Sequence, residues 1–143
     1  MSVSLESQNL TITYSCDRGI TAADFIDLLQ RSTLGERRPV DDAVRIQRML
    51  DNANVLVTAW AGDKLVGVSR AVTDFSFCCY LSDLAVDSSF QHQGIGRELV
   101  RLTHQTAGGE TQLILLSAPK AISYYPKIGM KQFEYCFVRD RLS

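Results

Sequence analysis

Three stretches with alternating apolar and polar residues follow one another in the middle of the chain. Residues 55–61 and 65–73 are rich in β-branched side chains, and the turn residues Ala61-Gly62-Asp63-Lys64 between them predict a hairpin. A third stretch, residues 77–86, follows after so short a connection that it is expected to run antiparallel to the second. The chain is therefore predicted to build a three-stranded antiparallel meander, and every other element has to be placed around it.

The segments on either side of this meander are predicted as further strands and helices. Residues 10–14 predict a strand, and Thr21 predicts the N-cap of a helix over residues 22–31. The other predicted elements are a helix over 40–51, a helix over 94–107, a strand over 113–117 buried on both faces, a short helix over 120–128 and a closing strand over 131–139. This order implies an α/β fold of the α+β kind, with a central mixed sheet flanked by about four helices in a single domain, 1–143.

The composition narrows the classes of partner. The formal net charge is −1, with 15 basic and 16 acidic side chains, so we expect neither a nucleic-acid nor a membrane partner. The sequence has no apolar run of about 20 residues and no secretory signal at its beginning, which predicts a cytoplasmic protein. The 4 cysteines form no CxxC pair, so we expect reduced, mostly buried thiols and no metal site.

A glycine-spaced segment follows the third strand of the meander, at residues 91–97. Backbone N–H groups in the first turn of a helix lack intrahelical partners, and the helix dipole favours negative charge there. Gly94 and Gly96 carry no Cβ, so a pyrophosphate can approach the backbone closely, and Arg97 adds a cation. By itself this segment predicts only anion binding, or a tight strand-to-helix turn without a ligand. It matches neither the Rossmann fingerprint nor the P-loop.

Residues Gln91-His92-Gln93-Gly94-Ile95-Gly96 resemble the Q/R-x-x-G-x-G/A signature of the GNAT acetyltransferases. Residues 83–87 look like the strand that leads into that signature, and residues 121–130 are similar to the family's A-x-x-x-Y-x-x-x-G-F segment. The three matches occur in the family's order and spacing, and the resemblance extends over nearly the whole chain. It implies the GNAT-type acyl-CoA N-acyltransferase fold, with acetyl-CoA as co-substrate and no metal.

The resemblance also assigns roles to residues. Backbone groups of Leu84, Ala85 and Val86 would bind the pantetheine arm by strand-like pairing. The pyrophosphate would take N–H groups from Gln91, His92, Gln93, Gly94, Ile95, Gly96 and Arg97. Tyr125 would be the general acid that protonates the leaving CoA thiolate, the alternative being a packing aromatic. Tyr124 is expected to be cofactor wall or core. The chain departs from the family at Ala118, where an asparagine is common, and at Met130, where phenylalanine is usual.

The acceptor amine must also lose a proton. Asp83, on the strand before the cofactor-binding residues, and Asp74, in the preceding loop, are the candidate bases, with water as the third possibility. The alternative for Asp83 is a strand carboxylate paired with a nearby cation. Tyr80 lies on the opposite face of the strand from Asp83 unless a bulge intervenes. Arg37-Arg38 would either clamp a substrate carboxylate or form a solvated charge pair.

These residues predict an enzyme, an N-acetyltransferase that transfers acetyl from acetyl-CoA to a primary amine of a small molecule or peptide. The resemblance implies direct attack in a ternary complex. The alternatives are a non-catalytic acyl-CoA-binding sensor, which needs neither Tyr125 nor a base, and a nucleotide-binding protein, which ATP would stabilise. Dimers through the C-terminal strands are common in the family, so a homodimer is a further expectation.

Overall fold

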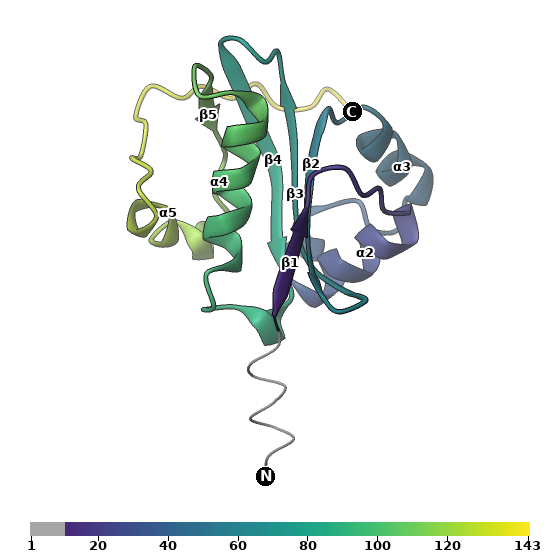
Figure 1. Cartoon of the computed structure of the whole chain (residues 1–143). Coiled ribbons are helices and arrows are strands. Elements are labelled where there is room, and N and C mark those ends of the chain that lie inside the picture. The colour runs from purple at the N-terminus through teal and green to yellow at the C-terminus, as the bar shows by residue number, and fades with distance from the viewer. Residues whose placement is uncertain (1–10) are drawn as a thin grey trace.

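The predicted meander forms the middle of a five-stranded sheet with the strand order β1-β2-β3-β4-β5 (Figure 1). The computed structural model describes residues 11–143. Strands β2 (Val55–Ala61), β3 (Lys64–Thr73) and β4 (Cys78–Val86) are antiparallel neighbours. At one edge β1 (Ile12–Ser15) pairs antiparallel with β2, and at the other β5 (Gln112–Ile114) runs parallel to β4. The prediction of a mixed sheet is therefore confirmed. Leu10, where the first strand was predicted to begin, lies outside the described residues.

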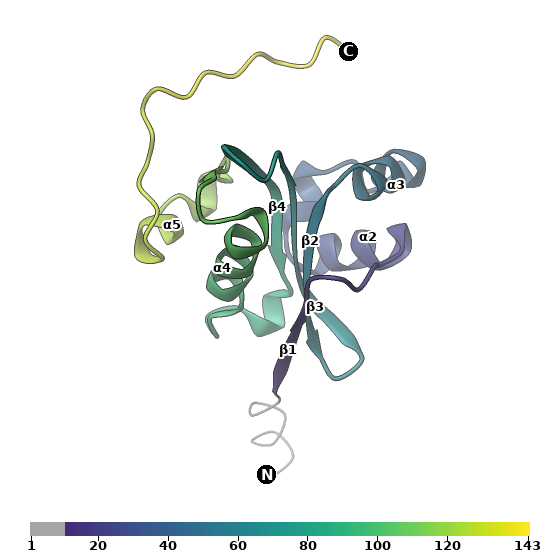
Figure 2. The ribbon, with the colours of Figure 1, turned by 45° about the horizontal axis from the view of Figure 1, so that its top comes forward.

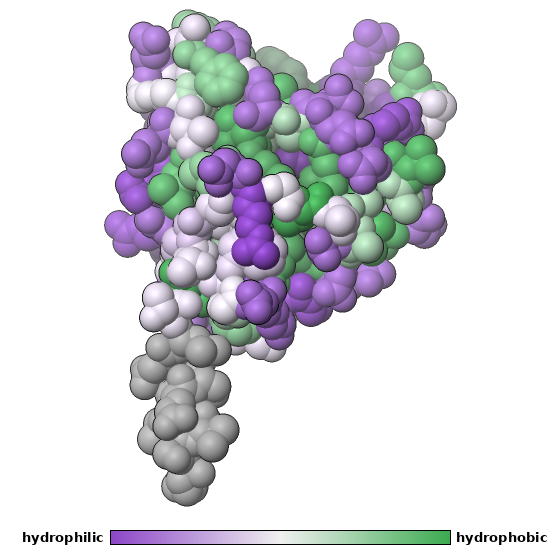
Figure 3. Space-filling model, turned by 45° about the vertical axis from the view of Figure 1, so that its right-hand side comes forward, coloured by the Kyte–Doolittle hydropathy of each residue, from purple (hydrophilic) through white to green (hydrophobic). Residues whose placement is uncertain are grey.

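Helices cover both faces of this sheet (Figures 1 and 2). On one face lie α2 (Ala22–Arg31) and α3 (Ala43–Asp51), and on the other lie α4 (Ile95–Ala107) and α5 (Tyr124–Lys127). Short 3-10 helices occur at η1 (Leu34–Arg37), η2 (Ser88–Phe90) and η3 (Pro119–Ala121). Hydrophilic side chains interspersed with hydrophobic ones are exposed on the α2–α3 side of the molecule (Figure 3).

Local signals explain where the first two helices begin. The Thr21 hydroxyl accepts from the Asp24 N–H and the Asp24 carboxylate accepts from the Thr21 N–H, a reciprocal capping box that starts α2 where the sequence predicts it. Helix α3 begins at Ala43 instead of residue 40, because the Asp42 carboxylate caps it by accepting from the N–H of Arg45.

Two hydrophobic clusters hold the layers together. The cluster under α4 includes Ile95 and Leu99, and the cluster under α2 and α3 includes Phe25. Full burial of such a side chain contributes about 1.5–3 kcal/mol. A Cβ on Gly67 of β3 would lie 3.0 Å from Leu99 Cδ1 and 3.1 Å from Ile95 Cγ2, so glycine lets α4 pack closely on the sheet. Helix α4 is thus fixed against the strands that lead to its N-terminus.

A β-bulge interrupts β4 at Ser82. Leu81 pairs with Ala71, whereas Asp83 pairs with Arg70, so Ser82 is an extra residue. Cross-strand partners share a face of the sheet, and consecutive residues of β3 lie on opposite faces. Asp83 and Leu81 therefore lie on opposite faces, and Asp83 lies on the same face as Tyr80. Tyr80 and Asp83 were expected on opposite faces unless a bulge intervened, and this bulge places them on the same face.

The C-terminal part of the chain differs most from the prediction. The predicted closing strand over 131–139 is wrong: these residues pair with no strand among residues 11–143, and Phe137 is 92% exposed. Figure 2 shows this segment running away from α5 and apart from the sheet. Apolar alternation forms a strand only where another strand supplies backbone partners, and no described strand lies beside this segment. The prediction over 113–117 is also too long, because β5 ends at Ile114, which is 53% exposed.

Two smaller expectations also need correction. The helix predicted over 120–128 is interrupted into η3 and α5. The thiols are not mostly buried: Cys79 is buried, whereas Cys16, Cys78 and Cys136 are exposed. None of the helices within residues 11–143 has the length and apolar character needed to cross a lipid bilayer.

Candidate active site

Strand β4 has an open edge over its second half. Strand β5 pairs with β4 only from Cys78 to Tyr80, whereas β4 continues to Val86. Beyond Tyr80, no strand within residues 11–143 pairs with that edge. The open edge contains the three residues predicted to contact pantetheine, Leu84, Ala85 and Val86. Unpaired backbone groups on an extended strand are suited to hydrogen bonds with an amide-containing arm.

The segment after β4 leads from this open edge to the N-terminus of α4. The Gln91 side-chain amide donates to the carbonyl of Val86 at 3.2 Å, which draws the loop towards the end of the strand. His92 and Gly94 have positive φ angles of 65° and 82°, and α4 begins immediately afterwards at Ile95. No side chain caps this N-terminus. Its first N–H groups are therefore available to an anion.

The side chains of this loop divide into anchors and exposed groups. Ile95 is 2% exposed and packs in the core, so it offers only its backbone to a ligand. The other predicted phosphate-binding residues are exposed or half-buried: Gln91, His92, Gln93, Gly94, Gly96 and Arg97. Nothing within 4 Å would meet a Cβ on Gly94, which leaves its surroundings open.

Asp87 ties the start of the loop to the rest of the protein. Its carboxylate lies 2.5 Å from Nη1 of Arg31 on α2 and 3.7 Å from Nζ of Lys64 on β3, and it accepts from the N–H of Ser89 at 2.8 Å. Burial alone raises the pKa of Asp87, but the hydrogen bonds from Ser89 and Arg31 and the two cationic charges outweigh it and lower that pKa. Arg31 also donates to the carbonyl of Leu65. The first residue of the loop is thus held in place by contacts with α2 and β3.

Two adjacent tyrosines on α5 lie beside this loop. The rings of Tyr124 and Tyr125 meet edge to face, with centroids 5.2 Å apart and planes at 75°. A Cβ built on Gly96 would lie 2.7 Å from the Tyr124 hydroxyl, so Tyr124 contacts the first turn of α4. Burial raises the pKa of the Tyr125 hydroxyl, and the neighbouring Tyr124 adds to the effect. Tyr125 is therefore protonated at neutral pH and can donate a proton.

Asp83 lies away from solvent, between two arginines. It is 0% exposed, and each carboxylate oxygen accepts from one guanidinium, Oδ1 from Arg38 and Oδ2 from Arg70. Arg38 also donates to the carbonyl of Ser82, and Arg70 donates to the Ser82 hydroxyl. The structure thus shows the alternative that the sequence left open, a strand carboxylate paired with cations. As positioned here, Asp83 is not free to take a proton from an amine.

The other sequence candidates also have structural positions. The Oδ1 atom of Asp74 accepts from the N–H groups of Ser76, Phe77 and Cys78 at 2.8–3.1 Å, and these bonds lower its pKa to about 2. Such a carboxylate is a weak base at neutral pH. Arg38 belongs to the buried ion pair, so the arginines at 37–38 do not form a solvated pair.

A cation beside Asp83 was an alternative that the sequence left open, but the sequence did not identify Arg38 and Arg70 as its partners. The pairing of Arg31 with Asp87 was not predicted. Arg31 and Asp87 are 56 residues apart, and Arg38 and Asp83 are 45 apart. No local pattern carries such pairs, because they depend on how α2 and η1 pack on β4. The bulge at Ser82 has no glycine or proline to mark it either.

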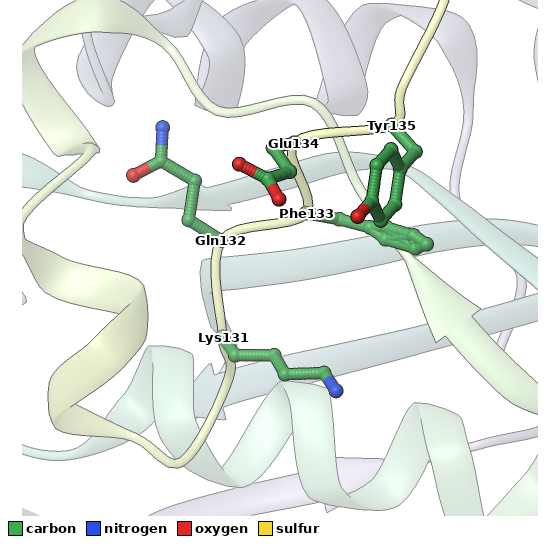
Figure 4. A pocket seen from close by; sticks show the side chains of 5 residues that line it. All are labelled: Lys131, Gln132, Phe133, Glu134 and Tyr135. Atoms are coloured by element: carbon green, nitrogen blue, oxygen red, sulfur yellow. The ribbon is translucent and has the colours of Figure 1, made fainter.

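Two shallow hollows lie elsewhere on the surface. One, of about 550 Å³, is lined by residues 131–135 of the C-terminal segment (Figure 4). There the Phe133 and Tyr135 rings meet edge to face, with centroids 5.5 Å apart. A second hollow lies beside Trp60, which the Arg18 guanidinium covers at 3.4 Å. Neither includes Tyr125 or the loop over 91–97, so the candidate site is defined by the open edge of β4 and the N-terminus of α4 and not by these hollows.

The sequence pattern described as the Acetyltransferase (GNAT) family matches residues 22–130. This chain belongs to that family. An uncharacterized N-acetyltransferase ycf52-like protein of Prochlorococcus marinus is 28% identical over 125 residues, which are 83% of this chain and 67% of the relative. Membership of the GNAT family places the chain among the acetyltransferases.

Solved structures of GNAT proteins share the fold. A GNAT-family acetyltransferase from Streptococcus pneumoniae superposes with a TM-score of 0.72 at 23% identity, covering 93% of this chain and 98% of that one. The aminoglycoside N-acetyltransferase AAC(6')-Iy, solved in complex with CoA, gives 0.70 at 12% identity and covers 93% and 96%. At these identities the likeness shows the fold, and the predicted GNAT-type fold is confirmed.

The open edge of β4 and the N-terminus of α4 together suit a CoA molecule. The open edge of β4 offers backbone groups to the amides of pantetheine, and the uncapped N-terminus of α4 offers N–H groups to the pyrophosphate. The exposed Arg97 carries a positive charge in the first turn of the same helix. The candidate site therefore has a strand edge for the amide-containing part and an anion-binding helix end for the phosphates.

Proposed function

We propose that this GNAT protein is a cytoplasmic N-acetyltransferase that moves acetyl from acetyl-CoA to a primary amine of a small molecule or peptide. The observation that carries the proposal is the arrangement of three features: the open edge of β4, the uncapped N-terminus of α4 that follows it, and Tyr125 on α5, which packs against the Tyr124 that contacts α4. The first two suit the donor substrate. The third supplies a proton.

In the proposed reaction both substrates are bound together. Bound acetyl-CoA supplies the thioester. The amine nitrogen forms a bond to the acetyl carbon, and the bond between that carbon and sulfur breaks. Tyr125 gives its hydroxyl proton to the departing thiolate, and the amine loses its extra proton to water. Because its pKa is raised by burial, Tyr125 regains a proton readily at neutral pH.

We propose that the amine is deprotonated without a carboxylate base. A primary amine with a pKa near 10 is roughly 0.1% neutral at pH 7. The two guanidinium groups of Arg38 and Arg70 outnumber the single carboxylate of Asp83, which leaves an excess positive charge beside β4. A positive charge near a bound ammonium group lowers its pKa and favours the neutral, reactive amine.

The test compares wild type with Tyr125→Phe in a thiol-release assay over a panel of amines. We expect kcat to fall about 100-fold or more in the variant, with little change in KM for acetyl-CoA. Tyr135→Phe is the matched control, since Tyr135 is 72% exposed on the C-terminal segment. If acetyl-CoA raises the melting temperature of wild type while no amine releases CoA, the protein is an acyl-CoA sensor instead. Stabilisation by ATP with Mg²⁺ and not by CoA would favour a nucleotide-binding protein.

We also propose a homodimer. Strand β5 is at the edge of the sheet, and within residues 11–143 it pairs with β4 alone. In the sequence, the segment over 131–139 has aromatic residues at the alternate positions 133, 135 and 137, and Tyr135 and Phe137 are exposed. An exposed sheet edge and an unpaired alternating segment on the same chain are complementary when two copies meet.

A further inference from the structure

Gly96 is the point where β4, α4 and α5 come together. A Cβ built there would lie 2.7 Å from the hydroxyl oxygen of Tyr124, 3.5 Å from its ring carbon Cζ and 3.8 Å from Cγ2 of Val86. The hydroxyl, and not the ring, therefore makes the closest approach to the first turn of α4. Any residue larger than glycine at this position would displace it.

The Tyr124 hydroxyl can donate a hydrogen bond at this place. Tyr124 is half-buried, and its hydroxyl is not among any buried unpaired groups of residues 11–143, so with no hydrogen bond to those residues the hydroxyl is open to solvent and to a ligand. Burial raises the pKa of Tyr124 and outweighs the opposite effect of the Arg97 charge, so the hydroxyl keeps its proton at neutral pH. It lies beside helix N–H groups that no side chain caps. The hydroxyl, the uncapped N–H groups and the charge of Arg97 can all interact favourably with an anion that has several oxygen atoms, while the one acidic residue of this turn, Glu98, is paired with Arg101.

Packing alone does not account for a tyrosine at this position. The ring carbon Cζ already lies at an ordinary contact distance from the Cβ position of Gly96, so a phenylalanine would cover the same surface. What tyrosine adds is one O–H donor. The neighbouring Tyr125 ring packs edge to face against the Tyr124 ring, with centroids 5.2 Å apart, so each ring helps to hold the other in place.

Resting on the proposed function, we propose that the Tyr124 hydroxyl donates a hydrogen bond to the pyrophosphate of acetyl-CoA. The adjacent tyrosines then divide the donor substrate between them. Tyr124 holds the phosphate end against Gly96, and Tyr125 serves the sulfur end. Helix α5 thereby fixes the distance between the anchored phosphates and the reacting thioester.

The test measures binding and does not depend on turnover. Isothermal titration of CoA into wild type, Tyr124→Phe and Tyr125→Phe gives the affinity of each. A hydrogen bond to a charged group predicts that Tyr124→Phe binds CoA about 10-fold or more weakly. Pantetheine, which lacks the pyrophosphate, should bind wild type and Tyr124→Phe equally in a competition titration. Tyr125→Phe should keep its CoA affinity within about threefold, because its loss is expected in kcat.

Three results would overturn the proposal. The first is CoA affinity in Tyr124→Phe equal to that of wild type. The second is an equal loss of CoA and pantetheine affinity together with a lower melting temperature, which would show that Tyr124 only packs. The third is a CoA loss in Tyr125→Phe as large as in Tyr124→Phe. If no amine is ever acetylated, the proposed function fails, but a selective loss of CoA binding in Tyr124→Phe would still stand.

Discussion

Replacement of Asp83 by asparagine separates a structural carboxylate from a catalytic base. The variant keeps the size of the side chain and removes its charge, which leaves the guanidinium groups of Arg38 and Arg70 without their shared partner. Breaking a buried ion pair by removing one side costs about 3–5 kcal/mol. The Asp83 side chain is 0% exposed, and those of Arg38 and Arg70 are 20% and 9% exposed. Because Arg38 is partly solvated and an amide oxygen can still accept one hydrogen bond, the lower end of this range applies.

A loss of about 3 kcal/mol would lower the melting temperature by roughly 6–12 °C in a domain of this size. Thermal unfolding followed by circular dichroism measures it. The matched control is Asp63→Asn, since Asp63 is exposed in the turn between β2 and β3, and this variant should melt with wild type. Both variants are expected to be folded at 20 °C, where their activities can be compared.

The activity of Asp83→Asn decides the question. If Asp83 only holds the arginines, its removal increases the positive charge beside β4, so the variant keeps or gains kcat/KM relative to wild type at pH 7, and any gain disappears as the pH rises. If Asp83 is the general base, the variant loses about 10²–10⁴-fold at pH 7 and recovers as the amine deprotonates by itself at high pH. A variant that melts like wild type and shows this pH-dependent recovery would refute our reading of Asp83 as a structural group.

Three further outcomes follow from the contacts. Gly96→Ala should lower stability by about 1–3 kcal/mol by overpacking against the Tyr124 hydroxyl, and Tyr124→Phe should restore most of that loss in a double-mutant cycle followed by urea unfolding. Because the pKa of Asp74 is lowered from 3.8 to about 2 in the folded protein, wild type should be more stable than Asp74→Asn above pH 4. This difference in stability should shrink as the pH falls towards 2 and vanish below it. Urea unfolding at each pH measures it. Phe137→Glu should convert the proposed dimer to a monomer in sedimentation analysis while Leu142→Glu, equally exposed at 90%, should not; a monomeric wild type would contradict the dimer.

Elements with local signals could be predicted from the sequence. Helix α2 starts at the residue after Thr21 because two residues close together in the sequence, Thr21 and Asp24, form its capping box. Strand β2 has the predicted bounds, since β-branched residues and the glycine turn after it define both of its ends. The loop over 91–97 was located by its glycines, and the structure places it at an uncapped helix N-terminus.

Elements that depend on distant partners could not be predicted. The alternation over 131–139 is as regular as that of a true strand, but a strand needs a second strand to accept and donate its hydrogen bonds. The burial of Asp83 depends on Arg38, which reaches β4 only because η1 lies over it. The extra residue at Ser82 is visible only in the register between β3 and β4. In each case the missing information concerns which segments meet.

Two acidic residues, Asp83 in β4 and Asp87 just after it, hold the layer of α2 and α3 in place on the sheet. Arg31 of α2 binds Asp87 just after β4, and Arg38 binds Asp83 within the strand. Hydrophobic contacts beneath α2 and α3 are non-directional and would allow the layer to slide, whereas a guanidinium group that forms several hydrogen bonds accepts only one arrangement. A buried ion pair adds little net stability compared with apolar packing, so its contribution here is to position. The loop that follows β4 and the layer of α2 and α3 are therefore both anchored to one strand, β4, which keeps them in a fixed relation to each other.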